Sequence, residues 1–287
     1  MPEGDVVWRT ARRLHQALAG AEITGWDMRW PSLASTDLRG DVVTEVASRG
    51  KHLLLRTRGG WTLHSHLRME GSWRLRRTGA GPVRERDVRA VVASRTWTAV
   101  GVRLGMLDLV PTDREGTLVG HLGPDVLGPG WDPDAVRERI AADPRTIGET
   151  LLDQRVLAGV GTFYLCEACF LLGLTPWTPA ATVDAGRVVS LVHRLLTTNR
   201  ERAVQVTTGS SRPGENAFVH ARSGLPCRRC SSTIRVAALG EAPQQRVAFW
   251  CPTCQKGPTP TDHGLPMRPL GSAPRRSAGG PRYRSRT

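Results

Sequence analysis

The chain has 287 residues, enough for two domains that each bury a hydrophobic core. Its hydrophobic content of 39% and charged content of 23% are typical of a globular protein, and the sequence contains no run of about 18 apolar residues. The N-terminus lacks the basic and then apolar pattern of a signal peptide, so we expect a cytoplasmic protein without a membrane partner. The net charge of +14 indicates an anionic polymer as partner, most simply nucleic acid.

The positive charge is not confined to one end. Residues 257–287 hold six arginines and one aspartate, so most of the excess belongs to residues 1–256. The same end is rich in proline and glycine, and we expect residues 257–287 to form a disordered basic tail. Lys51 and Lys256 are the only lysines among the 40 basic residues, which makes both worth examining.

The chain begins Met1-Pro2-Glu3-Gly4-Asp5, which contains a candidate nucleophile. Removal of Met1 would leave Pro2 as a free N-terminal amine. Such an amine has a pKa of about 8, against about 10.4 for a lysine, so more of it is neutral at physiological pH. We predict that Pro2 forms a Schiff base and that Glu3 acts as a general acid. The alternative is an ordinary helix start, because proline and acidic residues often open helices.

A helix is predicted directly after this segment, with Asp5 as its N-cap and Gly20 as its stop. Its apolar residues at helical spacing are Val7, Ala11, Leu14 and Leu18. The positive end of the helix would lie against Pro2 and disfavour protonation of the amine.

Short strand patterns follow the helix. They lie at residues 41–47, 52–57, 61–67, 88–93 and 96–102, with glycine-rich breaks between several of them. Several short strands at this spacing predict a β-sandwich. Residues 111–132 hold five glycines and three prolines and are predicted to link two domains.

From residue 133 the hydrophobic period becomes helical. We predict helices ending near Ile140, covering residues 150–154, ending at Leu172 and covering about residues 182–204. The glycine turn before the third of these ends at Gly161 and would leave backbone N–H groups pointing outward, which suits a phosphate. The alternative is a helix hairpin in which Thr162 only caps the next helix.

Four cysteines have the spacing of a metal site. They are Cys227, Cys230, Cys251 and Cys254, two CxxC pairs separated by 20 residues. This spacing predicts one structural zinc ion per chain, and two disulfides are the alternative. Cys166 and Cys169 form a third CxxC pair on an apolar helix, where buried, reduced cysteines are expected.

Three further polar residues stand out on the predicted strands. Lys51 precedes an apolar strand and would lie at its entrance, unless it is an ordinary surface lysine. His64 and His66 share one face of a strand. With no third ligand indicated, we expect packing or hydrogen-bonding roles for these histidines instead of metal binding.

Together these pieces resemble the Fpg/Nei DNA glycosylases, that is, formamidopyrimidine-DNA glycosylase and endonuclease VIII. The resemblance covers residues 2–256. It rests on four motifs in the family's order, at residues 2–4, 49–53, 151–161 and 246–255. It implies an α+β multidomain fold with an N-terminal helix and β-sandwich, then a helix-two-turns-helix domain with a C-terminal zinc finger.

The domains expected from the resemblance are residues 1–110 (catalytic), 111–132 (linker), 133–226 (helix-two-turns-helix), 227–256 (zinc finger) and 257–287 (tail). The implied activity is that of a bifunctional DNA glycosylase and AP lyase of base excision repair. The implied partner is damaged double-stranded DNA, with single-stranded or bubble DNA also open, and we expect a monomer. Such an enzyme must flip the damaged nucleotide out of the duplex.

The resemblance also assigns roles to residues. Pro2 would attack C1′ of the deoxyribose, and Glu3 would handle the proton transfers of the sugar. Lys51 would assist near the sugar and phosphate, and Arg246 would bind phosphates around the lesion. Met69 would wedge into the vacated stack, with a core position as the alternative.

This sequence departs from the family pattern in places. Asp5 and Val6 stand where the family usually has proline and glutamate, and Thr162 replaces an asparagine after Gly161. The Pro-Glu-Gly start, and the lack of an Arg-Phe loop around residues 97–104, favour the endonuclease VIII side and oxidised pyrimidines. Preference for oxidised purines, or a catalytically silent DNA-binding paralogue, are the alternatives.

Overall fold

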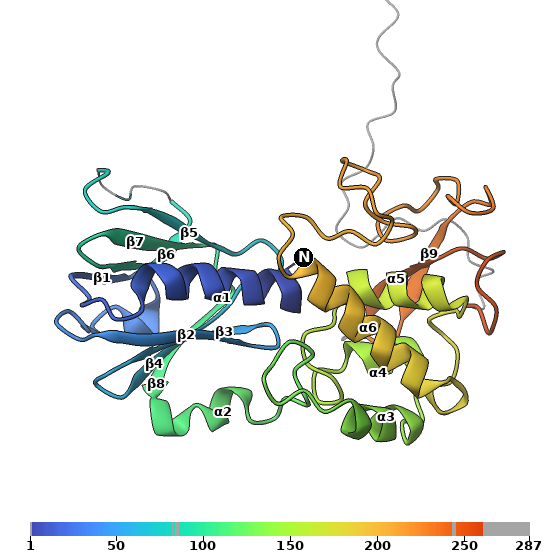
Figure 1. Ribbon diagram of the computed structural model, residues 1–287, viewed down its shortest axis with the longest axis horizontal. Helices are drawn as coiled ribbons and strands as arrows, with labels where there is room; N and C mark the ends of the chain where they lie inside the picture. Colours follow the sequence, from blue (N-terminus) through green and yellow to red (C-terminus); the bar gives the residue numbers. More distant parts are fainter. Residues whose placement is uncertain (1, 82, 84–85, 243–244, 261–287) are drawn as a thin grey trace, which may run out of the picture.

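The computed structural model describes residues 2–81, 83, 86–242 and 245–260. The chain forms two units side by side along the long axis of the molecule (Figure 1). Within the described ranges, no helix has the length and apolar character needed to cross a membrane. Nearly all of the expected basic tail, residues 261–287, lies outside the described residues.

The first unit is a β-sandwich with one long helix, α1 (Gly4–Leu18). Its strands are β1 (Gly25–Met28), β2 (Val43–Arg49), β3 (His52–Thr57), β4 (Trp61–His66), β5 (Ser72–Arg77), β6 (Val88–Ala93), β7 (Trp97–Val102) and β8 (Met106–Pro111). They form two four-stranded antiparallel sheets with the orders β1-β6-β7-β5 and β2-β3-β4-β8. A short 3₁₀ helix, Pro31–Leu33, follows β1.

Helix α1 contributes its apolar stripe to the core of the sandwich. Val7, Ala11, Leu14 and Leu18 are at most 3% exposed and pack with residues from both sheets. The expected N-cap was wrong: the helix begins at Gly4, and Glu3 occupies the N-cap position. Asp5 instead lies inside the first turn, where it is fully buried.

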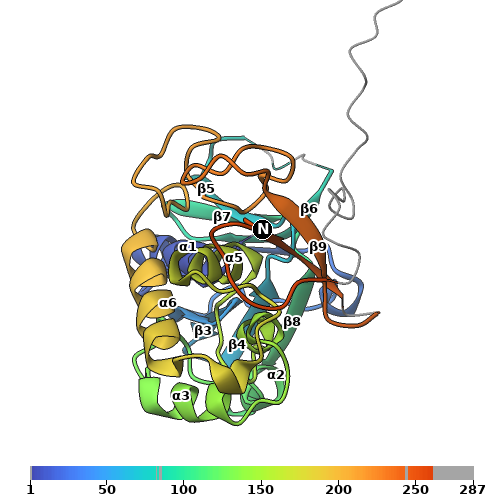
Figure 2. The ribbon, with the colours of Figure 1, turned by 90° about the vertical axis from the view of Figure 1, so that its right-hand side faces the viewer.

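The second unit consists of helices and one hairpin. Its helices are α3 (Pro133–Ala141), α4 (Ile147–Leu152), α5 (Thr162–Leu172) and α6 (Ala185–Asn199), and its strands are β9 (Arg235–Leu239) and β10 (Arg246–Trp250). The 3₁₀ segment Thr112–Arg114 and α2 (Gly116–Val119) precede it, and the 3₁₀ segment Ala180–Thr182 precedes α6. Helix α5 is buried between α6 on one side and the β9–β10 hairpin on the other (Figure 2).

Local capping explains where two helices differ from expectation. The helix expected at residues 150–154 begins earlier, because Thr146 and Glu149 form a capping box at the start of α4. The helix expected from residue 182 begins later, at Ala185, because the Asp184 side chain accepts a hydrogen bond from the Arg187 amide. Cys166 and Cys169 are buried and free in α5, as expected.

Candidate active site

Glu3 is held at the N-terminus of α5, in the other unit of the molecule. Its carboxylate accepts hydrogen bonds from the amides of Phe163 at 2.7 Å, Gly161 at 2.8 Å and Tyr164 at 3.4 Å. A negative group is favoured at this end of a helix by the unpaired amides and the helix dipole. These amides therefore point at Glu3, which corrects the expectation that they point outward to a phosphate.

Glycines allow the two units to approach this closely. The Gly4 amide donates to the Gly159 carbonyl at 2.8 Å, and a Cβ atom on Gly4 would lie 3.0 Å from Gly159 Cα. A Cβ atom on Gly161 would lie 2.5 Å from Glu3 Cδ. Gly159 itself has a φ of +107°, a conformation that favours glycine. The glycine turn thus packs directly against Glu3 and Gly4.

Glu3 and Lys51 influence each other's protonation. Burial raises the pKa of Glu3 to about 7, while the Lys51 ammonium and the amides of Phe163 and Gly161 oppose the rise. Burial also lowers the pKa of Lys51, opposed by the charge of Glu3. A carboxyl group with a pKa near 7 can both donate and accept a proton at physiological pH. Lys51 is therefore a half-buried residue whose charge is coupled to that of Glu3, unlike a fully solvated surface lysine.

Lys51 owes its position to the turn between β2 and β3. Gly50 has a φ of +59°, and its amide donates to Asp125 Oδ2 at 2.8 Å. Asp125 is buried and also accepts a hydrogen bond from the Leu127 amide at 3.0 Å. Asp125 was not predicted as a site residue, because it lies in the glycine- and proline-rich stretch that was expected to act only as a linker.

Met69 lies in the turn between β4 and β5 and is 67% exposed. The turn is tight: Arg68 has a φ of +53°, and the Gly71 amide donates to the Leu67 carbonyl at 2.8 Å. The neighbouring Glu70 forms an ion pair with Arg103 at 3.0 Å. The alternative that Met69 is a core residue was wrong, and its side chain is presented at the surface.

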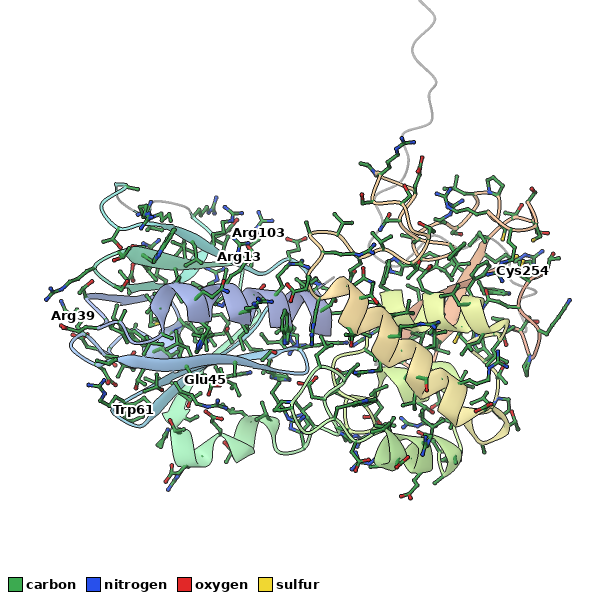
Figure 3. The ribbon with its side chains drawn as sticks, viewed as in Figure 1. Arg13, Arg39, Glu45, Trp61, Arg103 and Cys254 are labelled. Carbon is green, nitrogen blue, oxygen red and sulfur yellow. The ribbon has the colours of Figure 1, made fainter. Side chains whose placement is uncertain are left out.

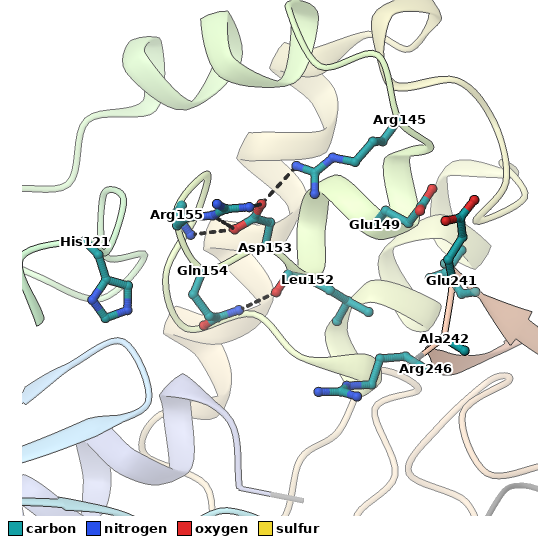
Figure 4. Close-up of a pocket in the computed structure, with 12 residues that line it drawn as sticks. His121, Arg145, Glu149, Leu152, Asp153, Gln154, Arg155, Glu241, Ala242 and Arg246 are labelled. Carbon is teal, nitrogen blue, oxygen red and sulfur yellow. Dashed lines mark hydrogen bonds and ion pairs between the residues drawn. The ribbon is translucent and has the colours of Figure 1, made fainter. Parts of the chain in front are cut away.

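Arg246 lies at the start of β10 and lines a pocket of about 880 Å³ between α4 and the β9–β10 hairpin (Figure 4). The charge of Arg246 lowers the pKa of Lys51, so the two cations lie near each other. Arg145 and Arg155 line the same pocket and both contact Asp153, at 3.0 and 2.8 Å. Lys51 thus lies within electrostatic range of both Glu3 and Arg246.

The histidines of β4 make hydrogen bonds, as expected. His64 is buried, and its Nε2 lies 2.8 Å from His52 Nδ1 while its Nδ1 lies 2.9 Å from Asp108 Oδ2. His66 Nδ1 accepts a hydrogen bond from the Arg68 amide at 2.9 Å. These contacts orient the imidazole rings beside the turn that carries Met69.

Four cysteine side chains converge at the outer end of the second unit. The Sγ atoms of Cys227, Cys230, Cys251 and Cys254 all lie within 4.8 Å of one another, an arrangement that could hold a metal ion. The Sγ atoms of Cys230 and Cys251 are 3.4 Å apart and those of Cys227 and Cys254 are 3.9 Å apart, far longer than the ~2.05 Å of a disulfide. All four cysteines are free, so the disulfide alternative was wrong. Cys254 is remote from the start of α1 (Figure 3), which indicates a structural site instead of a catalytic one.

Comparison with known protein families agrees with this architecture. The family model of the formamidopyrimidine-DNA glycosylase N-terminal domain matches residues 1–108, and that of the formamidopyrimidine-DNA glycosylase H2TH domain matches residues 122–213. The chain belongs to this family of DNA glycosylases. The resemblance inferred from four short motifs is therefore confirmed over both units.

Relatives within the family lie on the endonuclease VIII side, as expected. The chain is 49% identical to the probable endonuclease 8 2 of Streptomyces coelicolor, over 92% of this chain and 97% of the relative. It is 45% identical to the DNA-(apurinic or apyrimidinic site) lyase Nei2 of Mycolicibacterium smegmatis, over 89% and 99%. An Escherichia coli endonuclease 8 is 32% identical, over 89% and 100%.

Solved structures of family members share the fold. A Lactococcus lactis Fpg bound to DNA that contains N7-benzyl-Fapy-dG matches with a TM-score of 0.73 at 23% identity, over 89% of this chain and 100% of that one. MutM bound to DNA that contains carbocyclic 8-oxo-G matches with a TM-score of 0.74 at 24% identity, over the same shares. The predicted fold class is thereby confirmed.

Proposed function

We propose that this protein is a bifunctional DNA glycosylase and AP lyase of base excision repair that prefers oxidised pyrimidines. The observation that carries the proposal is the buried Glu3 carboxyl at the start of α1, whose pKa is coupled to the charge of the half-buried Lys51. The curated relatives named endonuclease 8 and DNA-(apurinic or apyrimidinic site) lyase support it.

In the proposed reaction, Pro2 is the nucleophile once Met1 has been removed. Its nitrogen bonds to C1′ as the bond from C1′ to the base breaks, and the base leaves with the electron pair. Glu3 handles the proton transfers at the sugar, and Lys51 assists near the sugar and phosphate. The C1′–O4′ bond then breaks and O4′ takes up a proton, which leaves C1′ joined to the proline nitrogen as an iminium. An iminium formed by a secondary amine is positive without protonation, so it withdraws electrons from the sugar and allows elimination of the phosphates on both sides.

DNA would be held by residues around this centre. Arg246 would bind phosphates beside the lesion, and Met69 would fill the gap left by the flipped nucleotide. Thr162, which follows Gly161 at the start of α5, would add a phosphate contact. The net charge of +14 supports binding that weakens steeply with salt.

Zinc is the metal that we assign to the four cysteines. Four cysteine sulfurs within 4.8 Å of one another suit Zn²⁺, which four thiolates would bind with no open position for catalysis, and the ion would hold the β9–β10 hairpin. We further propose that the protein acts as a cytoplasmic monomer with the domains 1–110, 133–226 and 227–256, and that residues 111–132 link the first two.

A panel of single-lesion oligonucleotides tests the proposed function. Duplexes that carry one oxidised pyrimidine, one oxidised purine or one abasic site are incubated with excess enzyme, and single-stranded and bubble forms are run beside them. Fastest cutting at the oxidised pyrimidine supports the proposal. Fastest cutting at the oxidised purine would show that the enzyme prefers oxidised purines. Tight binding without any cutting would establish a catalytically silent DNA-binding paralogue.

A further inference from the structure

Asp5 is a buried carboxyl group that the proposed reaction does not use. It lies in the first turn of α1, two residues after Glu3, and is fully buried. Its Oδ1 accepts a hydrogen bond from Gln205 Nε2 at 2.9 Å. Gln205 comes from the segment that follows α6, so this contact joins parts of the chain that are 200 residues apart.

The second neighbour of Asp5 is Tyr164 of α5, which is also fully buried. Burial raises the pKa of Asp5, and the side chains of Gln205 and Tyr164 oppose that rise. Within the described part of the chain, neither Asp5 Oδ2 nor the Tyr164 hydroxyl has a partner at hydrogen-bond distance. Burial of a polar group costs free energy of folding unless hydrogen bonds compensate it. A buried carboxyl group at position 5 therefore suggests a functional role.

Gln205 begins a strap, residues 205–220, that runs past the start of α1 (Figure 1). The other end of the strap is fastened to Glu167, a fully buried carboxyl group of α5. Glu167 accepts hydrogen bonds from the amides of Phe218, Val219 and His220 at 2.8 to 2.9 Å, and from the Thr207 hydroxyl. The strap is therefore tied to α5 by Glu167 and to α1 by Asp5.

The first turn of α1 is thus held on three sides. Glu3 binds the N-terminus of α5, the Gly4 amide binds the Gly159 carbonyl, and Asp5 binds the strap. Of these three contacts, the one made by Asp5 is the one that restrains the turn relative to the strap. Misplacement of a reacting atom by about 1 Å can cost on the order of a hundredfold in rate.

We infer that Asp5 is a positioning residue that ties the strap to the nucleophile-bearing turn through hydrogen bonds, and so fixes the direction of the Pro2 amine. This inference rests on the proposed function. An asparagine at position 5 keeps an acceptor for Gln205 and offers a donor to the Tyr164 hydroxyl. An alanine keeps neither.

The test is single-turnover cutting and borohydride trapping on a duplex with one abasic site, alongside DNA affinity and thermal unfolding. The proteins are wild type, Asp5→Ala, Asp5→Asn and Gln205→Ala. Arg12→Ala is the matched control, because Arg12 lies on the same helix and pairs with Glu201 of the same segment from an exposed position.

We expect Asp5→Ala and Gln205→Ala to slow trapping by about tenfold or more while DNA affinity changes by less than about threefold. Asp5→Asn and Arg12→Ala should stay within about threefold of wild type. If Asp5→Ala does not fold, Gln205→Ala still tests the same contact from the strap side.

Wild-type rates in Gln205→Ala and in a folded Asp5→Ala would overturn the inference, as would an equal loss in Asp5→Asn and Asp5→Ala. Wild-type protein that neither traps nor cuts would instead overturn the proposed function, so the two failures are distinguishable.

Discussion

At the scale of single residues, the site depends on the Glu3 carboxyl group and the Lys51 ammonium group, each of which shifts the pKa of the other. The Glu3 carboxylate is stabilised by Lys51 and by three amides, and it is destabilised by burial. Burial prevails and raises the pKa of Glu3 to about 7. Both protonation states are then populated at physiological pH, which is what a group that moves protons in both directions needs.

Replacement of Lys51 by methionine should shift the pH profile. The Lys51 charge lowers the pKa of Glu3, so its removal raises that pKa above about 7 and keeps Glu3 protonated to higher pH. The measurement is the single-turnover rate of cutting at an abasic site between about pH 5.5 and 9. The change in cutting rate that occurs near pH 7 should shift to higher pH, and the rate itself should fall. Lys256→Met is the matched control, and no shift, or a shift to lower pH, in Lys51→Met would contradict the coupling.

Met69 should matter for duplex substrates alone. Its side chain is 67% exposed, so Met69→Ala should leave the melting temperature unchanged. If Met69 fills the vacated stack, excision from duplex DNA should fall by about tenfold while cutting of single-stranded DNA is preserved. Trp61→Ala, an exposed side chain at the far end of the sandwich (Figure 3), should not change the duplex-to-single-strand ratio. An equal loss on both substrates would argue against a wedge.

At the scale of elements, the spacing of apolar residues predicted the helices and strands in which that spacing is regular. Strands β3 and β6 have the predicted bounds, and α1 follows its apolar stripe. Strands β1, β5 and β8 were not predicted. β1 has only four residues, and β5 reads Ser-Trp-Arg-Leu-Arg-Arg, in which few apolar side chains mark the buried face. Such strands form because neighbouring strands offer hydrogen-bond partners, and single-sequence patterns do not record that pairing.

The glycine turn before α5 gives a steric test of the Glu3 position. Gly161 has an ordinary φ of −131°, so alanine meets no backbone penalty there, but its Cβ would lie 2.5 Å from Glu3 Cδ. Gly161→Ala should displace the carboxylate and reduce base excision by about a hundredfold, in a protein that is still folded. Gly130→Ala is the control, because a Cβ there has no neighbour within 4 Å. Full activity of Gly161→Ala would mean that Glu3 works from another position.

The β9–β10 hairpin should depend on its metal. Cys251 is fully buried within the cysteine cluster, so Cys251→Ser removes one ligand and should release zinc. Loss of the metal should loosen the hairpin that carries Arg246 and weaken DNA affinity by about tenfold or more. Metal content is measured together with the dissociation constant for lesion DNA. Affinity that survives complete loss of zinc would show that the finger is dispensable for binding.

At the scale of the whole molecule, the active site is built where two units meet. The sequence predicted Pro2, Glu3, Lys51 and Arg246 through short motifs in a fixed order. It did not predict the supporting side chains, which include the buried Asp125 and Glu167 and the half-buried Gln205. The contacts of Gln205 with Asp5 and of Asp125 with Gly50 span 200 and 75 residues. Those contacts exist only once both units have folded, and no local pattern encodes them.

The burial of the charged residues in the site could not be predicted from their residue types. Charged residues such as Glu3, Asp5 and Lys51 are ordinarily expected at the surface. Here glycines at positions 4, 50, 159 and 161 let backbone segments approach closely, and the side chains of Glu3 and Asp5 are buried while that of Lys51 is half-buried. This burial, in turn, shifts their pKa values toward the range in which proton transfer is useful.

The central claim is that Pro2 is the nucleophile. Its direct test is borohydride trapping on an oligonucleotide with one abasic site, using protein whose N-terminus has been shown by mass spectrometry to begin at Pro2. Wild type should form a covalent adduct, and Pro2→Gly or protein that retains Met1 should lose it while still binding duplex DNA. Equal trapping by all three proteins would contradict the account, because the covalent bond would then come from another amine.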